Sequence, residues 1–458
     1  MTELPSNPQD LRAPDPGIRA LFKIDNRYQA WMDVEAALAR AQAKMGMIPA
    51  EAADEICRKA DFSQFDRERL LEGFRTSGHT LTPLVWELAR LCDGDAGGYV
   101  HWGATTQNIV QTGDLLVLRQ ADRIFRGQLA GLLETMAALA ERHAESAMPG
   151  RTHGQHAVPT TFGAKVGVWL DEIGNHGDRL IAVEPRVFRA MLGGAAGTLA
   201  SFGDEGFELQ DAFAAELDMG PMPAPSRAEG EHLAEYVLLL SLLAATVTKI
   251  AREIYTLQKQ EFGELEEPTP PGSVGSSTMP QKRNPFMCQD VIALAAEVRM
   301  QVPLALESMM TEHEADRMTE LLVRQATERA AVATGDMLSR LQVILNGLTV
   351  KTERMRANLD LTNGLIMAEP VMLALGKQIG RQEAHDVVYD AAQTAATTGK
   401  QFADLLAADE RVANRLSRTD IDALLDPTAY VGLSPALAHR MATGGRTMAT
   451  RLRSTLDA

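Results

Sequence analysis

The chain has 458 residues, of which 45% are hydrophobic, so it can bury more than one hydrophobic core. Its 61 acidic residues outnumber 45 Lys and Arg, and the net charge of −16 argues against a nucleic-acid surface. The three cysteines lie far apart without a CxxC pair, which argues against a disulfide framework or zinc site and indicates a reducing compartment.

The start of the chain and its most apolar segment bear on location. The N-terminal residues lack an apolar stretch between a basic start and a cleavage site, so we expect no signal peptide and a cytoplasmic protein. The longest apolar run, residues 236 to 247, has about half of the ~20 residues that a membrane span needs. We therefore expect a buried helix there and no membrane partner.

Helical spacing dominates the sequence. Aromatic residues make up 5% of it, while Ala, Leu, Glu, Arg and Gln recur three and four residues apart, which predicts an all-α fold. Helices should begin where a side chain that can cap a helix precedes a proline, because proline suits the first helical turn. Three such pairs are Thr82-Pro83, Asn284-Pro285 and Ser434-Pro435.

Four patterns are unusually long: residues 108 to 144, 161 to 182, 231 to 262 and 285 to 310. They are apolar on more than one side, so we expect them to assemble with copies of the same chain into a multi-helix core. Shorter helices broken by Gly and Pro flank them. We predict an N-terminal helical domain, a central long-helix bundle with a mobile catalytic loop, and a C-terminal helical domain, with the boundaries 1–105, 106–362 and 363–458.

Hydroxyl and imidazole groups gather before the first long helix. His79 stands three residues before Thr82, and residues 100 to 112 (VHWGATTQNIVQT) bring Thr105 and Thr106 to a predicted helix start. Free N–H groups and the helix dipole favour an anion there. Capping of the helix would by itself explain one of the two threonines.

Residues 150 to 163 (GRTHGQHAVPTTFG) crowd polar side chains into what we interpret as the loop that enters the second long helix. A histidine with a pKa near ~6.5 is a suitable proton donor at neutral pH. A lone histidine in such a loop is more often structural, but the neighbours of His153 favour a site. These neighbours are Arg151, Thr152, Gln155 and His156.

The most informative segment is 272 to 285 (GSVGSSTMPQKRNP), in which Gly, Ser and Pro prevent a continuous helix. A loop of hydroxyls followed by Lys282 and the predicted cap Asn284 can surround a carboxylate with N–H groups, an ammonium and a helix dipole. The alternative is a mobile linker in solvent. For a binding loop, we expect residues 274 to 281 to be mobile without ligand and to close over a dicarboxylate.

Other polar groups are expected to lie outside any site. His143 and His176 stand in charged helical contexts and are predicted at the surface. Residues 313 to 316 (HEAD) lack the HExxH spacing of a helical zinc site, and only the first and last would share a helix face. We therefore predict no metal site.

The stretch GSSTMPQKRNP resembles the signature loop of the fumarase/aspartase superfamily, whose common form is GSSxMPxKxNP. The resemblance implies that Ser276 is the general base and that Lys282 and Asn284 hold a substrate carboxylate. It also implies that Ser277 and Met279 bind substrate.

Three other segments resemble the same superfamily. GRTHGQHAVPTTFG is similar to GRTHxxHAxPTTFG of adenylosuccinate lyases, which implies that His153 is the general acid and that Thr152 and Gln155 bind substrate. VHWGATTQNIVQT is similar to HxGxTSxDxxDT, and the GH and TPLV groups before it combine features of adenylosuccinate lyases and carboxymuconate cycloisomerases. These matches imply four more substrate-binding residues, His79, His101, Thr105 and Thr106.

Departures from both subfamilies leave the substrate open. Residues 363 to 385 resemble carboxymuconate cycloisomerases and carry Glu369 within the group that replaces the SxR phosphate site of adenylosuccinate lyases. Bacterial cycloisomerases, however, usually have an aromatic residue at the position of His153. Residues 225 to 235 lack the RDR-like segment of both subfamilies, and Gln289 replaces a glutamate that orients the catalytic histidine.

The resemblance implies a lyase without cofactor or metal that acts on a succinyl-type dicarboxylate, cleaves a carbon–nitrogen bond and releases fumarate. Lactonisation of 3-carboxy-cis,cis-muconate and a non-catalytic structural role, as in lens crystallins, are the alternatives. In this superfamily three chains of a homotetramer meet at each active site. Thr105, His153 and Ser276 are therefore expected to come from three different chains.

Overall fold

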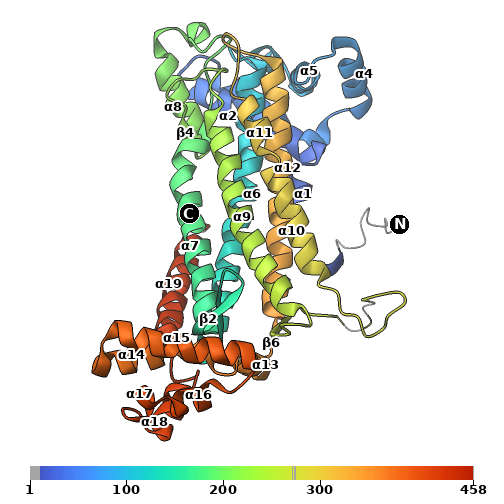
Figure 1. Cartoon of the computed structure of the whole chain (residues 1–458). Helices are drawn as coiled ribbons and strands as arrows, with labels where there is room; N and C mark the ends of the chain where they lie inside the picture. Colours follow the sequence, from blue (N-terminus) through green and yellow to red (C-terminus); the bar gives the residue numbers. More distant parts are fainter. Residues whose placement is uncertain (1–10, 271, 273–274, 457–458) are drawn as a thin grey trace. The chain divides into compact units, whose positions relative to one another are not determined.

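A computed structural model describes residues 11–270, 272 and 275–456 (Figure 1). Helices make up 69% and strands 5% of it, so the predicted all-α class is confirmed. The chain forms two compact units, each assembled from three stretches of sequence. Unit 1 comprises Met1–Gln128, Asp178–Ala245 and Ala293–Ser339, and unit 2 comprises Leu129–Gly177, Thr246–Ile292 and Arg340–Ala458. The predicted domain boundaries follow sequence order rather than spatial contact, and they stay a prediction.

Unit 1 is built around helix α2, which is buried at most positions between Ala30 and Gln42. Trp31, Leu38 and Phe213 belong to its hydrophobic core. The elements that lie wholly in unit 1 are α1 (Ile18–Leu21), α2 (Ile24–Lys44), α3 (Ala50–Lys59), η2 (Phe62–Gln64), α4 (Arg67–Ser77), α5 (Thr82–Leu91), η3 (Ala96–Tyr99), β3 (Arg189–Ala190), η4 (Ala200–Glu205), α8 (Gly206–Glu216), β4 (Gly220–Pro221) and α11 (Val302–Glu307).

Unit 2 holds two small antiparallel sheets and a series of shorter helices, the latter orange to red in Figure 1. Val371, Phe402 and Ile421 belong to a hydrophobic core among those helices. The elements that lie wholly in unit 2 are β1 (Ala147–Thr152), β2 (Gln155–Thr161), β5 (Leu265–Glu266), β6 (Thr349–Val350), α13 (Thr352–Leu359), η5 (Asp360–Thr362), η6 (Leu365–Met367), α14 (Ala368–Ile379), α15 (Arg381–Thr398), α16 (Phe402–Ala408), α17 (Glu410–Ala413), α18 (Arg418–Leu424) and α19 (Ser434–Ser454).

Long helices contribute residues to both units: α6 (Thr106–Arg142), α7 (Phe162–Val187), α9 (Glu231–Gln258), α10 (Phe286–Arg299) and α12 (Arg317–Asn346). The first three confirm the predicted long helices to within a few residues. The fourth predicted helix is wrong in length, because α10 ends at Arg299 and α11 begins at Val302 with a proline in its first turn. Helix α12 was not predicted.

Two predicted helix starts are confirmed, but the predicted caps are not. Helices α5 and α19 begin at Thr82 and Ser434, and the residue at each N-cap position forms no capping side-chain hydrogen bond. Helix α10 begins two residues after Asn284. The Asn284 amide donates to the carbonyl oxygen of Gly275 at 2.6 Å, so this side chain is used inside the loop.

Helix α9 is the described helix that is long and apolar enough, by length and composition alone, to cross a membrane. The mean hydropathy of its most apolar window is 1.7, and 56% of that window is buried in the chain. A helix in the core of a globular protein has the same properties. Tyr236 in this helix donates a hydrogen bond to the buried carboxylate of Asp122 at 2.8 Å.

A buried ionic network joins α6, α7 and α9 within unit 1. The Arg126 guanidinium lies 2.7 Å from a carboxylate oxygen of Asp122 and 2.8 Å from one of Glu184. Burial raises the pKa of Asp122 to about 6, although the charge of Arg126 and the hydroxyl of Tyr236 act in the opposite direction. The negative charge of Asp122 is thus tolerated only with Arg126 beside it.

Candidate active site

The segment that carries His153 is a β-hairpin rather than the predicted helix-entry loop. Thr152 of β1 pairs with Gln155 of β2, which leaves His153 and Gly154 as a two-residue turn. Both have positive φ, 52° and 77°, as the type I′ turn of a tight hairpin requires. The right-handed twist of the two strands favours this turn, and Gly154 adopts it without strain.

The hairpin turn presents three predicted site residues together. Thr152, His153 and Gln155 are all exposed, so their polar groups are available to a ligand. His156, one residue further along β2, is half-buried, and burial and the charge of Arg151 lower its pKa. His156 is therefore neutral at neutral pH, and the proton-donor role stays with His153 as a prediction.

The base of the hairpin turn is fixed by a buried ion pair. Two nitrogens of Arg151 bind the two carboxylate oxygens of Glu264 at 2.6 Å and 3.0 Å. Glu264 is fully buried and also accepts a hydrogen bond from Asn358 at 2.7 Å. The guanidinium of Arg151 lies over the ring of Phe262. A bidentate pair of this kind restricts rotation of the Arg151 side chain.

Ser276 lies at the base of a loop that turns back on itself. Its Oγ accepts hydrogen bonds from the backbone N–H groups of Thr278 at 3.4 Å and Met279 at 3.1 Å. Gly275 is required there, because a Cβ at that position would lie 2.2 Å from the carbonyl oxygen of Lys282. The N–H groups favour negative charge on the Ser276 oxygen.

Cationic side chains surround a pocket beside this loop. Lys282, Asn284 and Met279 line it together with Lys259, which follows the end of α9. Neither lysine forms an ion pair with another residue in the part of the chain that the structure describes. The pocket therefore has the local positive charge that an anionic substrate of this acidic protein needs. Ser277 is exposed on the same loop, and the predicted motion of residues 274 to 281 includes Val274, which lies outside the described residues.

In unit 1, the structure brings the two predicted site residues His79 and Thr106 close together. His79 Nδ1 accepts hydrogen bonds from the N–H groups of Leu81 and Thr82, so it caps the start of α5. In a neutral imidazole the proton is then on Nε2, which lies 3.4 Å from the hydroxyl oxygen of Thr106. This arrangement leaves Nε2–H of His79 able to donate to a ligand.

The other two predicted residues of this region have different surroundings. The N–H of Thr105 donates to the side chain of Asn108 at 3.1 Å, one residue before α6 begins. His101 has a positive φ of 63°, and its Nδ1 lies 2.7 Å from the buried carboxylate of Glu35. Burial alone would lower the pKa of His101, but Glu35 outweighs burial and raises it. A role of either residue in substrate binding stays a prediction.

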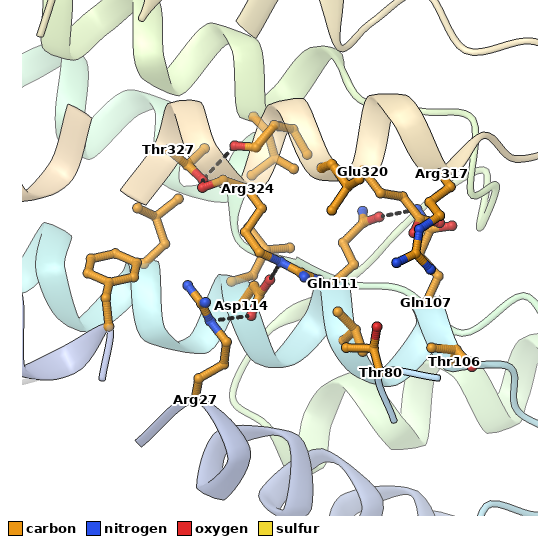
Figure 2. A pocket seen from close by; sticks show the side chains of 17 residues that line it. Arg27, Thr80, Thr106, Gln107, Gln111, Asp114, Arg317, Glu320, Arg324 and Thr327 are labelled. Carbon is orange, nitrogen blue, oxygen red and sulfur yellow. Dashed lines mark hydrogen bonds and ion pairs between the residues drawn. The ribbon is translucent and has the colours of Figure 1, made fainter. Parts of the chain in front are cut away.

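A cavity in unit 1 extends from Thr106 along facing sides of α6 and α12 (Figure 2). Its α6 wall uses residues three and four apart, which is one helix face. Asp114 lines this cavity, and its carboxylate lies between Arg27 at 3.3 Å and Arg324 at 3.0 Å. Arg317 and Glu320 lie near Gln107, at the end where α6 begins (Figure 2).

A cation stands beside this end of α6 although the RDR-like segment is missing. Arg227 donates from Nε to the side-chain oxygen of Gln107 at 2.8 Å and from Nη1 to the carbonyl oxygen of Ala195 at 3.1 Å. It also lies 3.7 Å from the carboxylate of Glu320. Arg227 and the cavity residues other than Thr106 were not predicted, because their partners are distant in the sequence or lie on the unpredicted helix α12.

Known proteins resemble this chain along almost its full length. Residues 10–300 match the family described as "Lyase", and residues 364–441 match "Adenylosuccinate lyase C-terminus". The adenylosuccinate lyase of Methanothermobacter thermautotrophicus is 37% identical over 438 residues, which are 95% of this chain and 98% of that relative. The N-acetyl-S-(2-succino)cysteine lyase of Enterococcus italicus is 38% identical over 416 residues, 91% of each chain.

Solved structures agree with these matches. The 3-carboxy-cis,cis-muconate lactonizing enzyme from Pseudomonas putida has a TM-score of 0.88 and 32% identity, covering 96% of this chain and 99% of its own. The chain therefore belongs to the fumarase/aspartase superfamily of lyases, as its signature loop predicts. Within that superfamily its relatives carry the names of different substrates, so the subfamily is a separate question.

Proposed function

We propose that the protein is a lyase that removes a proton beside a carboxylate and expels the group on the neighbouring carbon, releasing fumarate from a succinyl-type dicarboxylate. The observation that carries this proposal is the loop from Gly275 to Asn284. It combines a serine oxygen that accepts hydrogen bonds from two N–H donors with the ammonium of Lys282, which forms no ion pair with any described residue. This combination suits proton abstraction from an anionic substrate.

The chemical difficulty is the proton itself, which is weakly acidic because its removal leaves a dianionic aci-carboxylate. Lys282 and the loop N–H groups can stabilise that charge as it develops. Ser276 takes the proton as the alkoxide, a form that its two N–H donors favour. His153, at the exposed hairpin turn, then donates a proton to the leaving atom from the opposite side.

The leaving atom is proposed to be nitrogen, with sulfur as the second candidate. The relatives named adenylosuccinate lyase and N-acetyl-S-(2-succino)cysteine lyase support both. A nucleotide is disfavoured, because Glu369 brings a carboxylate to the first turn of α14, where the hydroxyl of Tyr430 binds it at 2.9 Å. That carboxylate would repel a phosphate.

The test is a substrate panel followed by the ultraviolet absorbance of fumarate. Succinyl-amines with and without a nucleotide, succinyl-thioethers and 3-carboxy-cis,cis-muconate are each incubated with the protein. Fumarate from a non-nucleotide succinyl-amine supports the proposal, and fumarate from thioethers alone supports the second candidate. Conversion of the muconate without release of fumarate would contradict the proposed lyase activity and support lactonisation. The absence of turnover with every compound would support a structural role.

We also propose a cytoplasmic homotetramer whose active sites are shared between subunits, with a small dicarboxylate as partner and neither nucleic acid nor membrane. Exposed apolar side chains support association, because a lone chain would leave them in water. Leu242 of α9 is 51% exposed, and Met300 and Met310 are 67% and 63% exposed. Members of the superfamily are typically oligomeric.

A further inference from the structure

Between α9 and the signature loop, the short acidic segment Glu264 to Glu267 carries three carboxylates with three sets of partners. The pairing of β5 with β6 holds this segment, and the N–H of Lys351 donates to the carbonyl of Glu264 at 2.9 Å. Leu265 is fully buried. The acidic segment is therefore held in a fixed position in unit 2, and its carboxylates can bind and position other side chains.

One carboxylate reaches the hairpin and another reaches the loop. Glu264 forms the bidentate pair with Arg151, two residues before His153. Glu266 binds Arg283, which is adjacent to Lys282, and also the ammonium of Lys351 at 2.6 Å. Glu264 and Glu266, which bind the hairpin and the loop, are only two residues apart in the chain.

The third carboxylate fixes the end of the loop. Both oxygens of Glu267 accept hydrogen bonds from the first turn of α10, from the N–H of Met287 at 3.0 Å and of Cys288 at 2.9 Å. A carboxylate at this position stabilises the helix start through the helix dipole. The first turn of α10, which begins two residues beyond Asn284, is thereby held in place.

We infer that Glu264 and Glu266 are positioning residues of the active site, Glu264 for the hairpin turn with His153 and Glu266 for the loop with Lys282. This inference rests on the proposed function. Neither glutamate needs to touch the substrate. Each acts through an arginine that is joined by the backbone to a proposed site residue, and small displacements of such residues lower rates by as much as about 100-fold.

Two neutral substitutions separate the two roles. Glu264→Gln should lower kcat about 10- to 100-fold with little change in KM, because the hairpin turn carries the proposed acid. Glu266→Gln should mainly raise KM, by about 10-fold, because Lys282 binds substrate in the ground state as well. Glu261→Gln is the matched control, since Glu261 is exposed in the preceding turn and its carboxylate has no ion pair with any described residue.

A purely structural role would give a different pattern. It would lower stability and change kcat and KM in the same way for both variants, which would overturn the inference. Because Glu264→Gln leaves a buried arginine without its partner, the double variant Arg151→Gln/Glu264→Gln is made as well. Recovery of kcat above that of Glu264→Gln supports a positioning pair, and the absence of recovery contradicts it.

Hydrogen exchange without substrate keeps this test independent of the reaction. In Glu264→Gln, exchange should become faster at residues 152 to 155, and in Glu266→Gln at residues 278 to 284, while the control matches the wild type. Unchanged exchange in both segments would overturn the inference even if the lyase activity is established. Faster exchange in a protein that turns over none of the substrates would leave the positioning intact and contradict only the proposed function.

Discussion

At the scale of single residues, the environment of Ser276 differs from that of a serine activated by histidine. Its Oγ is held by two backbone N–H donors. Donors of this kind stabilise the alkoxide form of the serine, as they stabilise the anion in an oxyanion hole. They favour ionisation of the hydroxyl, but unlike a histidine they do not accept its proton. Lys282 and Lys259 line the pocket beside this loop and add positive charge there.

Replacement of Ser276 by Ala should abolish almost all elimination while substrate affinity is kept. A general base contributes about 100-fold or more to the rate, and it acts mainly while the proton moves. Equilibrium binding and steady-state turnover are measured on the same preparation. Ser277→Ala is the matched control, because Ser277 is the exposed neighbour on the same loop.

A different base is indicated if Ser276→Ala keeps more than about a tenth of the wild-type rate, since that loss is far below the one expected for proton abstraction. If Ser277→Ala is the more damaging of the two changes, the roles of the serines are exchanged.

At the scale of elements, the hairpin turn is the most demanding piece of backbone in the site. Gly154→Val should lower activity and weaken the hairpin by about 1–2 kcal/mol, because a branched side chain disfavours positive φ. Open space surrounds the position, so the effect is backbone strain and not a clash. Gly154→Asn should retain most activity, because Asn accepts this conformation. Turnover and melting temperature are compared for both variants, and equal loss in both would point to a requirement for glycine itself.

The buried network of α6, α7 and α9 predicts a dependence on pH. Arg126→Met removes the charge that compensates Asp122, so it should cost about 3–5 kcal/mol at pH 8. Asp122 has a raised pKa of about 6, and a protonated carboxyl needs no counter-charge. Loss of Arg126 raises this pKa further, because the charge of Arg126 lowers it in the wild type. The loss of stability should therefore shrink as the pH falls from 8 to about 6, and it should stay small below that, where Asp122 is protonated in both proteins.

Thermal melting at pH 8 and pH 5 measures this difference. The double variant Arg126→Met/Asp122→Asn serves as its control, because it removes both charges and should melt closer to the wild type at both pH values. A cost for Arg126→Met that is the same at both pH values would mean that Asp122 is not the group that titrates.

Periodicity and motifs predicted much of this fold and its superfamily and named the residues of the candidate site, whose roles stay predictions, and they failed where the determining contact is distant. The long helices were found because their apolar spacing is local, but α12 was missed although it mixes polar and apolar residues much as α6 does. The hairpin was missed because His153 occupies a turn position usually filled by Asn or Asp. His176 was expected at the surface, yet it is buried and lies 2.9 Å from the hydroxyl of Thr246, seventy residues away.

At the scale of the whole molecule, the scatter of the site residues becomes an argument about assembly. Thr105, His153 and Ser276 lie in widely separated segments, and the proposal assigns each to a different chain of a tetramer. Two inactive proteins should then repair each other. In a random mixture of Ser276→Ala and His153→Ala chains, a site is intact when its serine comes from a His153→Ala chain and its histidine comes from a Ser276→Ala chain. Each choice has a chance of about one half, which gives roughly one intact site in four.

The two variants are unfolded together, refolded in equal amounts and assayed beside each parent refolded alone. Activity near a quarter of the wild type supports shared sites. Activity no greater than the sum of the parents, in samples that contain mixed oligomers by mass spectrometry, means that Ser276 and His153 of one chain serve the same site.

The apolar surface of α9 also constrains how a newly made chain matures. Under the proposed assembly, a chain that has not yet met other copies exposes side chains such as Leu242 on a helix that is, by length and composition, as apolar as a membrane segment. Correct association with another copy is a second-order reaction, so it slows as the chain concentration falls. Aggregation begins from the same exposed surface. The yield of active enzyme after dilution from denaturant should consequently pass through an optimum in chain concentration. Below it, chains wait too long for partners, and above it, aggregation outruns assembly.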